Sequence, residues 1–115
     1  MNETDRELLE LAAKAAGLEI HSYDPISDRI YTPRSLPMLE GSYLHTWNPL
    51  TDDGDAFRLA VKLHMCVTSF TDEKMVGYVI NGEGYNVHEL PGTDPYAATR
   101  RAIVRAAAEI GRAMP

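Results

Sequence analysis

Apolar and polar positions follow a helical period at the start of this chain. Within residues 4–16 the apolar positions recur every three or four residues, at Leu8, Leu11, Ala12 and Ala15. This spacing is typical of an amphipathic helix. Thr4 and Glu7 fit the capping box with which many helices begin. Gly17 then supplies the left-handed residue that commonly ends a helix, so the pattern predicts a helix over 4–16.

The period changes after Gly17. Residues 18–23 alternate apolar with polar side chains, which predicts a half-buried strand. Residues 24–49 contain four of the seven prolines, at Pro25, Pro33, Pro37 and Pro49. Because proline removes a backbone donor and restricts the residue before it, we predict a long loop with at most one or two short edge strands. Such loops often carry function, so we expect the binding surface here first.

A second helix is predicted over residues 52–64. The residues that share one face of it are Phe57, Ala60, Val61 and His64. Asp52, Asp53 and Asp55 stand at its start, where carboxylates suit the positive end of the helix dipole, and Thr51 or Asp52 can serve as its cap.

The region that follows has the signature of an antiparallel meander. Residues 65–70 and 75–80 are strand-like runs joined by the polar connection 71–74, as in a hairpin. A third run, residues 85–90, follows the turn 81–84. The glycines of that turn lie between two strands rather than before a helix, so we interpret them as turn residues and not as a phosphate-binding loop.

A last helix is predicted over residues 95–111. Asp94 is a good cap, Pro95 suits the first helical position, and Gly111 is expected to end the helix. The order of elements predicts one α+β domain spanning residues 1–115, with three helices packed on a small, mostly antiparallel sheet of about four to five strands.

Composition and cysteine content agree with a single soluble domain. The chain has 115 residues, 44% hydrophobic and 24% charged, close to the globular average. Its one cysteine, Cys66, lies between Met65 and Val67, so we expect a buried free thiol in a reducing compartment. No secretory signal and no apolar run of about 20 residues is present, so we expect a cytoplasmic protein that does not enter a membrane.

The charge is uneven along the chain. The formal net charge is −6, made of −8 over residues 1–90 and +2 over residues 91–115. An acidic body repels phosphate, so nucleic acid and anionic membranes are disfavoured as partners.

Three segments, residues 7–20, 47–63 and 97–110, together resemble the phage α-β-α sandwich domain, a group of small proteins found in bacteriophages and prophages. The most specific stretch is Trp-Asn-Pro-Leu-Thr-Asp-Asp-Gly-Asp at residues 47–55, which leads into an amphipathic helix. The resemblance implies an α/β/α sandwich and a phage or prophage source. It implies no activity, no cofactor and no site residue.

The side chains with metal-binding or catalytic chemistry favour structural roles. Asp52, Asp53 and Asp55 supply oxygens that Ca²⁺ or Mg²⁺ accepts, but they do not follow the EF-hand pattern, and helix capping explains them better. The histidines at positions 21, 45, 64 and 88 do not form with Cys66 the paired spacing of zinc motifs. Nucleophilic catalysis requires an exposed, activated Cys66, and its apolar neighbours indicate burial. We therefore expect no catalytic residue, no metal and no cofactor.

Two surfaces are candidates for binding. In the first, Trp47 joins Tyr31 and Tyr43 in an aromatic surface, although a single tryptophan beside Asn-Pro also suits the edge of a core. The candidate binding residues are Tyr43, Trp47, Asn48, Asp52 and Asp53.

The second candidate surface is the last helix, with Arg100, Arg101 and Arg105. The order α-β-β-β-α resembles the double-stranded RNA-binding domain, but residues 94–98 read Asp-Pro-Tyr-Ala-Ala where that family has lysines. This departure puts phosphate contact in doubt, and a solvated helix face explains the arginines better.

These observations favour a non-catalytic phage or prophage accessory protein, in the cytoplasm of a bacterial host, that binds a host or phage protein. Two alternatives remain open: a small ligand- or nucleotide-handling enzyme that uses His45, His88 or an aspartate as base, and a nucleic-acid-binding protein that acts through the last helix. An uncovered sheet edge also allows a homodimer.

Overall fold

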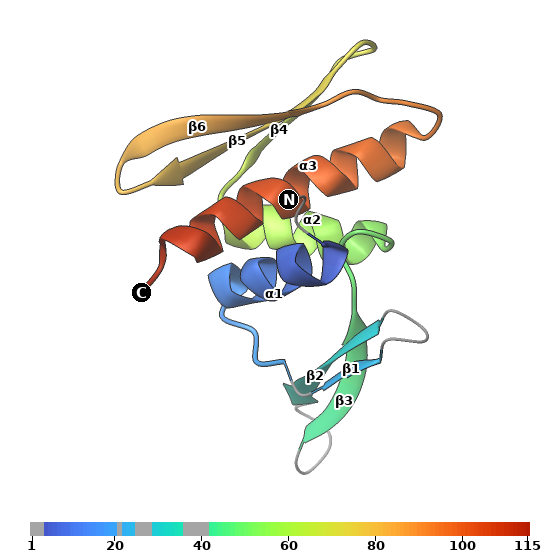
Figure 1. Ribbon diagram of the computed structural model, residues 1–115, viewed down its shortest axis with the longest axis vertical. Helices are drawn as coiled ribbons and strands as arrows, with labels where there is room; N and C mark the ends of the chain where they lie inside the picture. The colour runs from blue at the N-terminus through green and yellow to red at the C-terminus, as the bar shows by residue number, and fades with distance from the viewer. Residues whose placement is uncertain (1–3, 21, 25–28, 36–41) are drawn as a thin grey trace.

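The computed structural model describes residues 4–20, 22–24, 29–35 and 42–115, which form three helices and six strands (Figure 1). The helices are α1 (Asp5–Ala16), α2 (Asp53–Lys62) and α3 (Pro95–Ala113). The strands are β1 (Ser22–Asp24), β2 (Arg29–Ser35), β3 (Ser42–Trp47), β4 (Cys66–Ser69), β5 (Lys74–Ile80) and β6 (Glu83–Glu89). The predicted α+β class is confirmed, with six strands in the described residues instead of four or five.

Each helix begins directly after a residue whose side chain caps it. The Thr4 hydroxyl accepts a hydrogen bond from the amide of Glu7 at 3.1 Å, and the Asp52 carboxylate accepts one from the amide of Asp55 at 2.8 Å. The Asp94 carboxylate accepts bonds from two amides of the first turn of α3. These side chains satisfy donors that have no partner inside the helix, so local chemistry alone sets where the helices begin.

The predicted meander is confirmed: β4, β5 and β6 form an antiparallel sheet in that order. Asn81 and Gly82 form the two-residue turn between β5 and β6, and both have positive φ, 52° and 82°. A tight hairpin turn requires this backbone, and Asn-Gly is the sequence that adopts it most readily. Gly82 is therefore a turn residue as predicted, whereas Gly84 lies inside β6 opposite Val79, because that strand already begins at Glu83.

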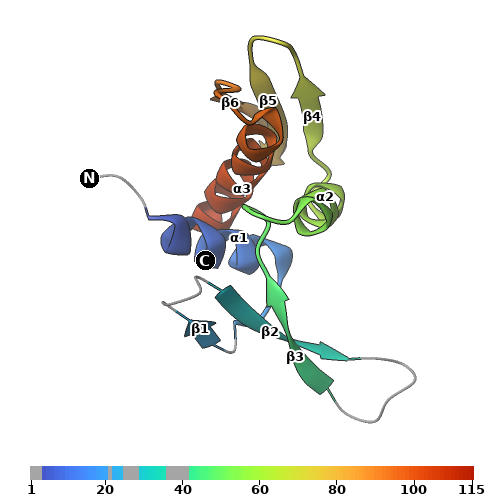
Figure 2. The same ribbon diagram turned by 90° about the vertical axis from the view of Figure 1, so that its right-hand side faces the viewer.

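Helix α3 is the centre of the core. One side of it packs on the meander and the other contacts α1 and α2 (Figures 1 and 2). The layers therefore follow the order meander, α3, then α1 with α2. Eight residues of α3 are buried: Ala98, Ala102, Ile103, Val104, Ala106, Ala107, Ala108 and Gly111. Most of them are small, which lets the neighbouring elements approach the helix axis closely.

Helix α3 was predicted to end near Gly111 and ends at Ala113, so Gly111 itself lies inside the helix. The glycine lies instead where α3 crosses α1. A Cβ atom on Gly111 would overlap the carbonyl oxygen of Leu11 and stand 2.9 Å from its carbonyl carbon. Only a residue without a side chain fits between the two backbones.

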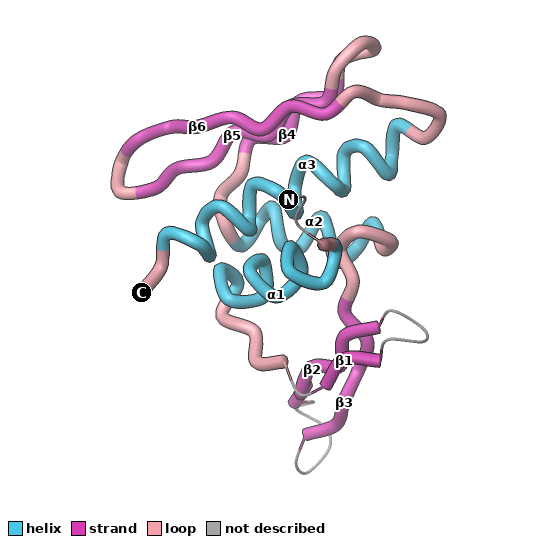
Figure 3. The backbone as a smooth tube through the Cα atoms, viewed as in Figure 1, coloured by secondary structure: helices cyan, strands magenta, loops and turns pink. Residues whose placement is uncertain are grey.

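Strands β1, β2 and β3 form a second antiparallel sheet, on the side of α1 away from the meander (Figure 3). The prediction of a long loop over residues 24–49 was therefore wrong. Pro33 does lie in a strand, opposite Leu44 of β3. Among the described residues, β1 pairs with β2 only up to Tyr31, so at Pro33 the strand has a neighbour on one side only, and such an edge tolerates a proline.

The strand predicted over residues 18–23 is reduced to β1, which begins at Ser22. The amide of Leu18 donates to the carbonyl of Ala13 at 2.9 Å and so completes the end of α1. Leu18 and Ile20 pack against the core. Their alternation therefore reflects contact with the helices and not pairing in a sheet, and His21 lies outside the described residues.

Candidate functional site

A groove of about 760 Å³ lies between α2, β4 and the first half of α3. Phe57 and Val61 of α2 form one wall, Val67 of β4 forms the other, and Tyr96 and Ile103 of α3 lie between them. The volume falls in the range of sites that hold drug-sized molecules. Its walls come from three elements that the core holds in place.

The side chains along this groove are apolar and exposed. Phe57 is 69% exposed, Tyr96 70%, Val61 59% and Val67 42%. A cluster of exposed large apolar side chains on a small protein commonly marks an interaction site.

Helix α2 buries one stripe of its apolar residues and leaves others exposed beside the groove. Its buried residues are Ala56, Leu59 and Ala60, whereas Phe57 and Val61, which were predicted to share a face with Ala60, are exposed. The small side chains of Ala56 and Ala60 let α2 approach the core closely, which leaves Phe57 and Val61 to overhang the gap toward β4. The sequence held a signal that some apolar residues of α2 stay exposed, since α2 has more apolar residues than one buried stripe needs.

Strand β4 forms the other wall and is an edge strand of the meander. Its sequence, Cys-Val-Thr-Ser, carries no charge and no proline. Edge strands usually carry charged residues, prolines or bulges that prevent further pairing. The opposite edge, β6, has Glu83, His88 and Glu89. The edge beside the groove is thus the less protected of the two.

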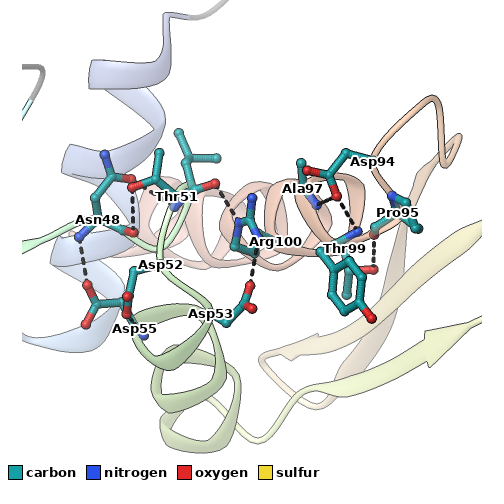
Figure 4. Close-up of polar contacts among 12 residues, drawn as sticks. Asn48, Thr51, Asp52, Asp53, Asp55, Asp94, Pro95, Ala97, Thr99 and Arg100 are labelled. Atoms are coloured by element: carbon teal, nitrogen blue, oxygen red, sulfur yellow. Dashed lines mark hydrogen bonds and ion pairs between the residues drawn. The ribbon is translucent and has the colours of Figure 1, made fainter.

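The end of the groove near the start of α2 is acidic. The Asp53 carboxylate pairs with the Arg100 guanidinium at 2.7 Å, and Arg100 also donates to the carbonyl of Leu50 at 2.8 Å (Figure 4). The Arg100 side chain is only 16% exposed, whereas that of Asp53 is 72% exposed. Both residues line the groove, and the carboxylate is the more exposed partner of this ion pair.

The binding residues predicted from sequence mostly have structural roles. Trp47 is 6% exposed and belongs to the core. Asn48 holds the turn before α2: its amide donates to Asp55 and its side chain accepts from Leu50, both at 2.9 Å (Figure 4). Asp52 is the cap of α2.

Of the predicted binding residues whose side chains the structure describes, only Asp53 lines the groove. Tyr43 lies in β3, and its side chain is outside the described part of the structure. The sequence therefore predicted a residue at the acidic end of the groove but none of those in its apolar walls.

The three arginines predicted as a nucleic-acid face hold α3 to its neighbours. Arg100 contacts the start of α2, as described above. Arg101 pairs with Asp5 of α1 at 3.1 Å. Arg105 donates to the carbonyl of His88 at 2.9 Å and forms an ion pair with Glu89. Each guanidinium already faces an acidic residue of the chain itself, which disfavours phosphate contact.

Arg100→Gln is expected to lower the free energy of unfolding by about 1–2 kcal/mol, because it removes a mostly buried guanidinium together with its bonds to Asp53 and to the backbone carbonyl of Leu50. Arg58→Gln is the control. Arg58 pairs with Asp55 at a similar distance, 2.8 Å, but is 71% exposed, so its loss should cost about 0.5 kcal/mol or less. Urea denaturation measures both, and equal losses would show that the Arg100 contacts do not hold α3 to α2.

Cys66 is exposed, so the prediction of a buried thiol was wrong. Side chains of a strand point alternately to its two faces, and Val67 takes the inner one. Cys66 lies with His64 and Asn86 at a second hollow of about 380 Å³. Among the described residues, no three His, Cys, Asp or Glu side chains are placed to hold a metal ion.

Two stacked tyrosines also line this second hollow, with ring centroids 5.6 Å apart. Burial raises the pKa of the Tyr78 phenol above its usual value. A hydrogen bond to Glu83 raises the pKa of Tyr85. Both phenols therefore stay protonated and uncharged at neutral pH.

In the described part of the chain, no helix combines the length and the apolar character that crossing a membrane requires. Comparison of the chain with protein-family models, with curated proteins and with solved structures finds no match.

Proposed function

We propose that this chain is a non-catalytic accessory protein of a phage or prophage that acts by binding a segment of a host or phage protein in the groove between α2, β4 and α3. The observation that carries the proposal is the exposure of Phe57, Val61 and Tyr96 beside the uncharged edge of β4. The phage or prophage source is supported only by the resemblance seen in the sequence.

A polypeptide suits this groove better than a small ligand or a nucleic acid. The groove offers apolar walls and, along β4, the backbone groups of an edge strand, and a polypeptide has the chemistry to meet both. A nucleic acid would meet a chain of net charge −6 whose arginines Arg100, Arg101 and Arg105 already face carboxylates.

Affinity capture from a bacterial lysate, with captured proteins identified by mass spectrometry, tests this proposal. Native protein should retain a stoichiometric partner, and Val61→Asp should lose it, because an aspartate in the apolar wall would be desolvated without a partner. Phe57→Gln serves as a second groove variant, since Phe57 is 69% exposed and its replacement leaves the core intact.

Val79→Asp is the matched control. Val79 is 59% exposed, the same fraction as Val61, but it lies in β5 and does not line the groove. It should retain the partner. Capture of nothing by the native protein, or equal capture by all the variants, would contradict the proposal.

A further inference from the structure

The hydrogen bonding of the meander shows which backbone groups face the groove side of β4. The amide of Phe70 donates to the carbonyl of Glu73 at 2.9 Å, so this is a hydrogen-bonded pair. Such pairs alternate along an antiparallel ladder. The register pairs Thr68 with Met75 and Val67 with Val76. Thr68 therefore lies in a hydrogen-bonded pair with β5. The N–H and C=O of Val67 point away from β5, toward the open edge of β4.

Val67 and Ser69 present both their backbone groups and their side chains to the groove. By the alternation just described, Ser69 follows Val67 in turning its N–H and C=O to the open edge of β4. Val67 and Ser69 are also the β4 residues whose side chains line the groove. In the described residues no strand pairs with this edge. A polypeptide lying along it would find hydrogen-bond partners and apolar walls together.

The charge of the groove selects among possible occupants. The exposed group at its acidic end is Asp53, 72% exposed, and Asp52 beside it is 60% exposed. A second copy of this chain would bring the same acidic end and the same net charge of −6, which opposes self-association. A segment with a basic residue complements the groove instead.

Building on the function proposed above, we infer that the groove takes an extended segment of another protein that adds to the open edge of β4 as a further antiparallel or parallel strand. Two apolar side chains of the segment, at positions i and i+2, enter between Phe57, Val61 and Ile103. A lysine or arginine of the segment lies beside Asp53.

Selection from a displayed library of short random peptides tests this inference. Peptides are selected on the native protein, with counter-selection on Val61→Asp, and the recovered sequences are synthesised. They should share two apolar residues at i and i+2 and a basic residue. Replacing the basic residue with glutamine should weaken binding about three- to fivefold, with a smaller effect on the Asp53→Asn variant. Every second N–H of the bound peptide should donate to β4. N-methylation at those positions should weaken binding about tenfold or more, and N-methylation at the positions between them should weaken it far less.

Amide hydrogen exchange gives the complementary result on the protein. Binding of a selected peptide should slow exchange of the Val67 and Ser69 amides, because the peptide then accepts from them. Recovered peptides that depend on Val61 but show helical spacing, or that tolerate N-methylation at every position, would overturn the inference and leave the proposed function standing. Self-association that Val61→Asp abolishes would assign the groove to a second copy and also overturn it. The absence of any peptide that distinguishes native protein from Val61→Asp would instead contradict the proposed function.

Discussion

Gly111→Ala is expected to destabilise the fold by about 2–3 kcal/mol, even though alanine is intrinsically the better helix former by about 1 kcal/mol. The added Cβ would overlap the carbonyl oxygen of Leu11, which is backbone and cannot rotate away. Helices α1 and α3 would have to separate, and the fully buried alanines between them, Ala12, Ala13 and Ala108, would lose contact. Thermal denaturation followed by circular dichroism should show a Tm lower by about 10 °C.

Gly84→Ala is the control for this substitution. No atom lies within 4 Å of a Cβ built on Gly84, and its backbone does not have positive φ. We expect its stability to stay within about 0.5 kcal/mol of native. A Gly111→Ala protein as stable as native would mean that α1 and α3 do not approach as closely as described.

Trp47→Ala is expected to lower the free energy of unfolding by about 3–5 kcal/mol, because it leaves a cavity where β3 meets the core. Trp47 is 6% exposed and is the only tryptophan of the chain. Its fluorescence in the native protein should therefore resist quenching by acrylamide and shift toward that of free tryptophan when urea unfolds the chain.

Trp47→Phe separates a core role from a binding role. Phenylalanine keeps part of the buried surface, so this variant should lose less stability than Trp47→Ala and should bind the partner as native protein does. A Trp47→Ala protein that stays stable but loses the partner would instead support the aromatic binding surface predicted from sequence.

Local chemistry explains why the helix starts and the meander were predictable. Thr4, Asp52 and Asp94 each bond to amides of the turn that follows, so the signal and the structure it causes lie within three residues. Asn81 and Gly82 form their turn for the same reason, since two adjacent residues adopt the positive φ that the hairpin requires.

The features that sequence reasoning missed depend on distant partners. Gly111 has the sequence position of a helix end, and only the approach of Leu11 from α1 shows why glycine is needed there. A proline in the sequence, such as Pro33, favours a loop over a strand. Only the structure shows that the short pairing of β1 with β2 places Pro33 at an edge. The groove was missed because Ala60 and Val61 are both apolar, and α3 decides which of them α2 buries.

We expect partners to bind at the groove and not at the sheet of β1, β2 and β3. Amide chemical-shift mapping by nuclear magnetic resonance, with a partner peptide added to isotopically labelled protein, tests it most directly. We predict the largest shifts at Phe57, Val61 and Val67, with little change over residues 29–35 and 42–46. Largest shifts in those two strands, with the groove residues unmoved, would contradict the account.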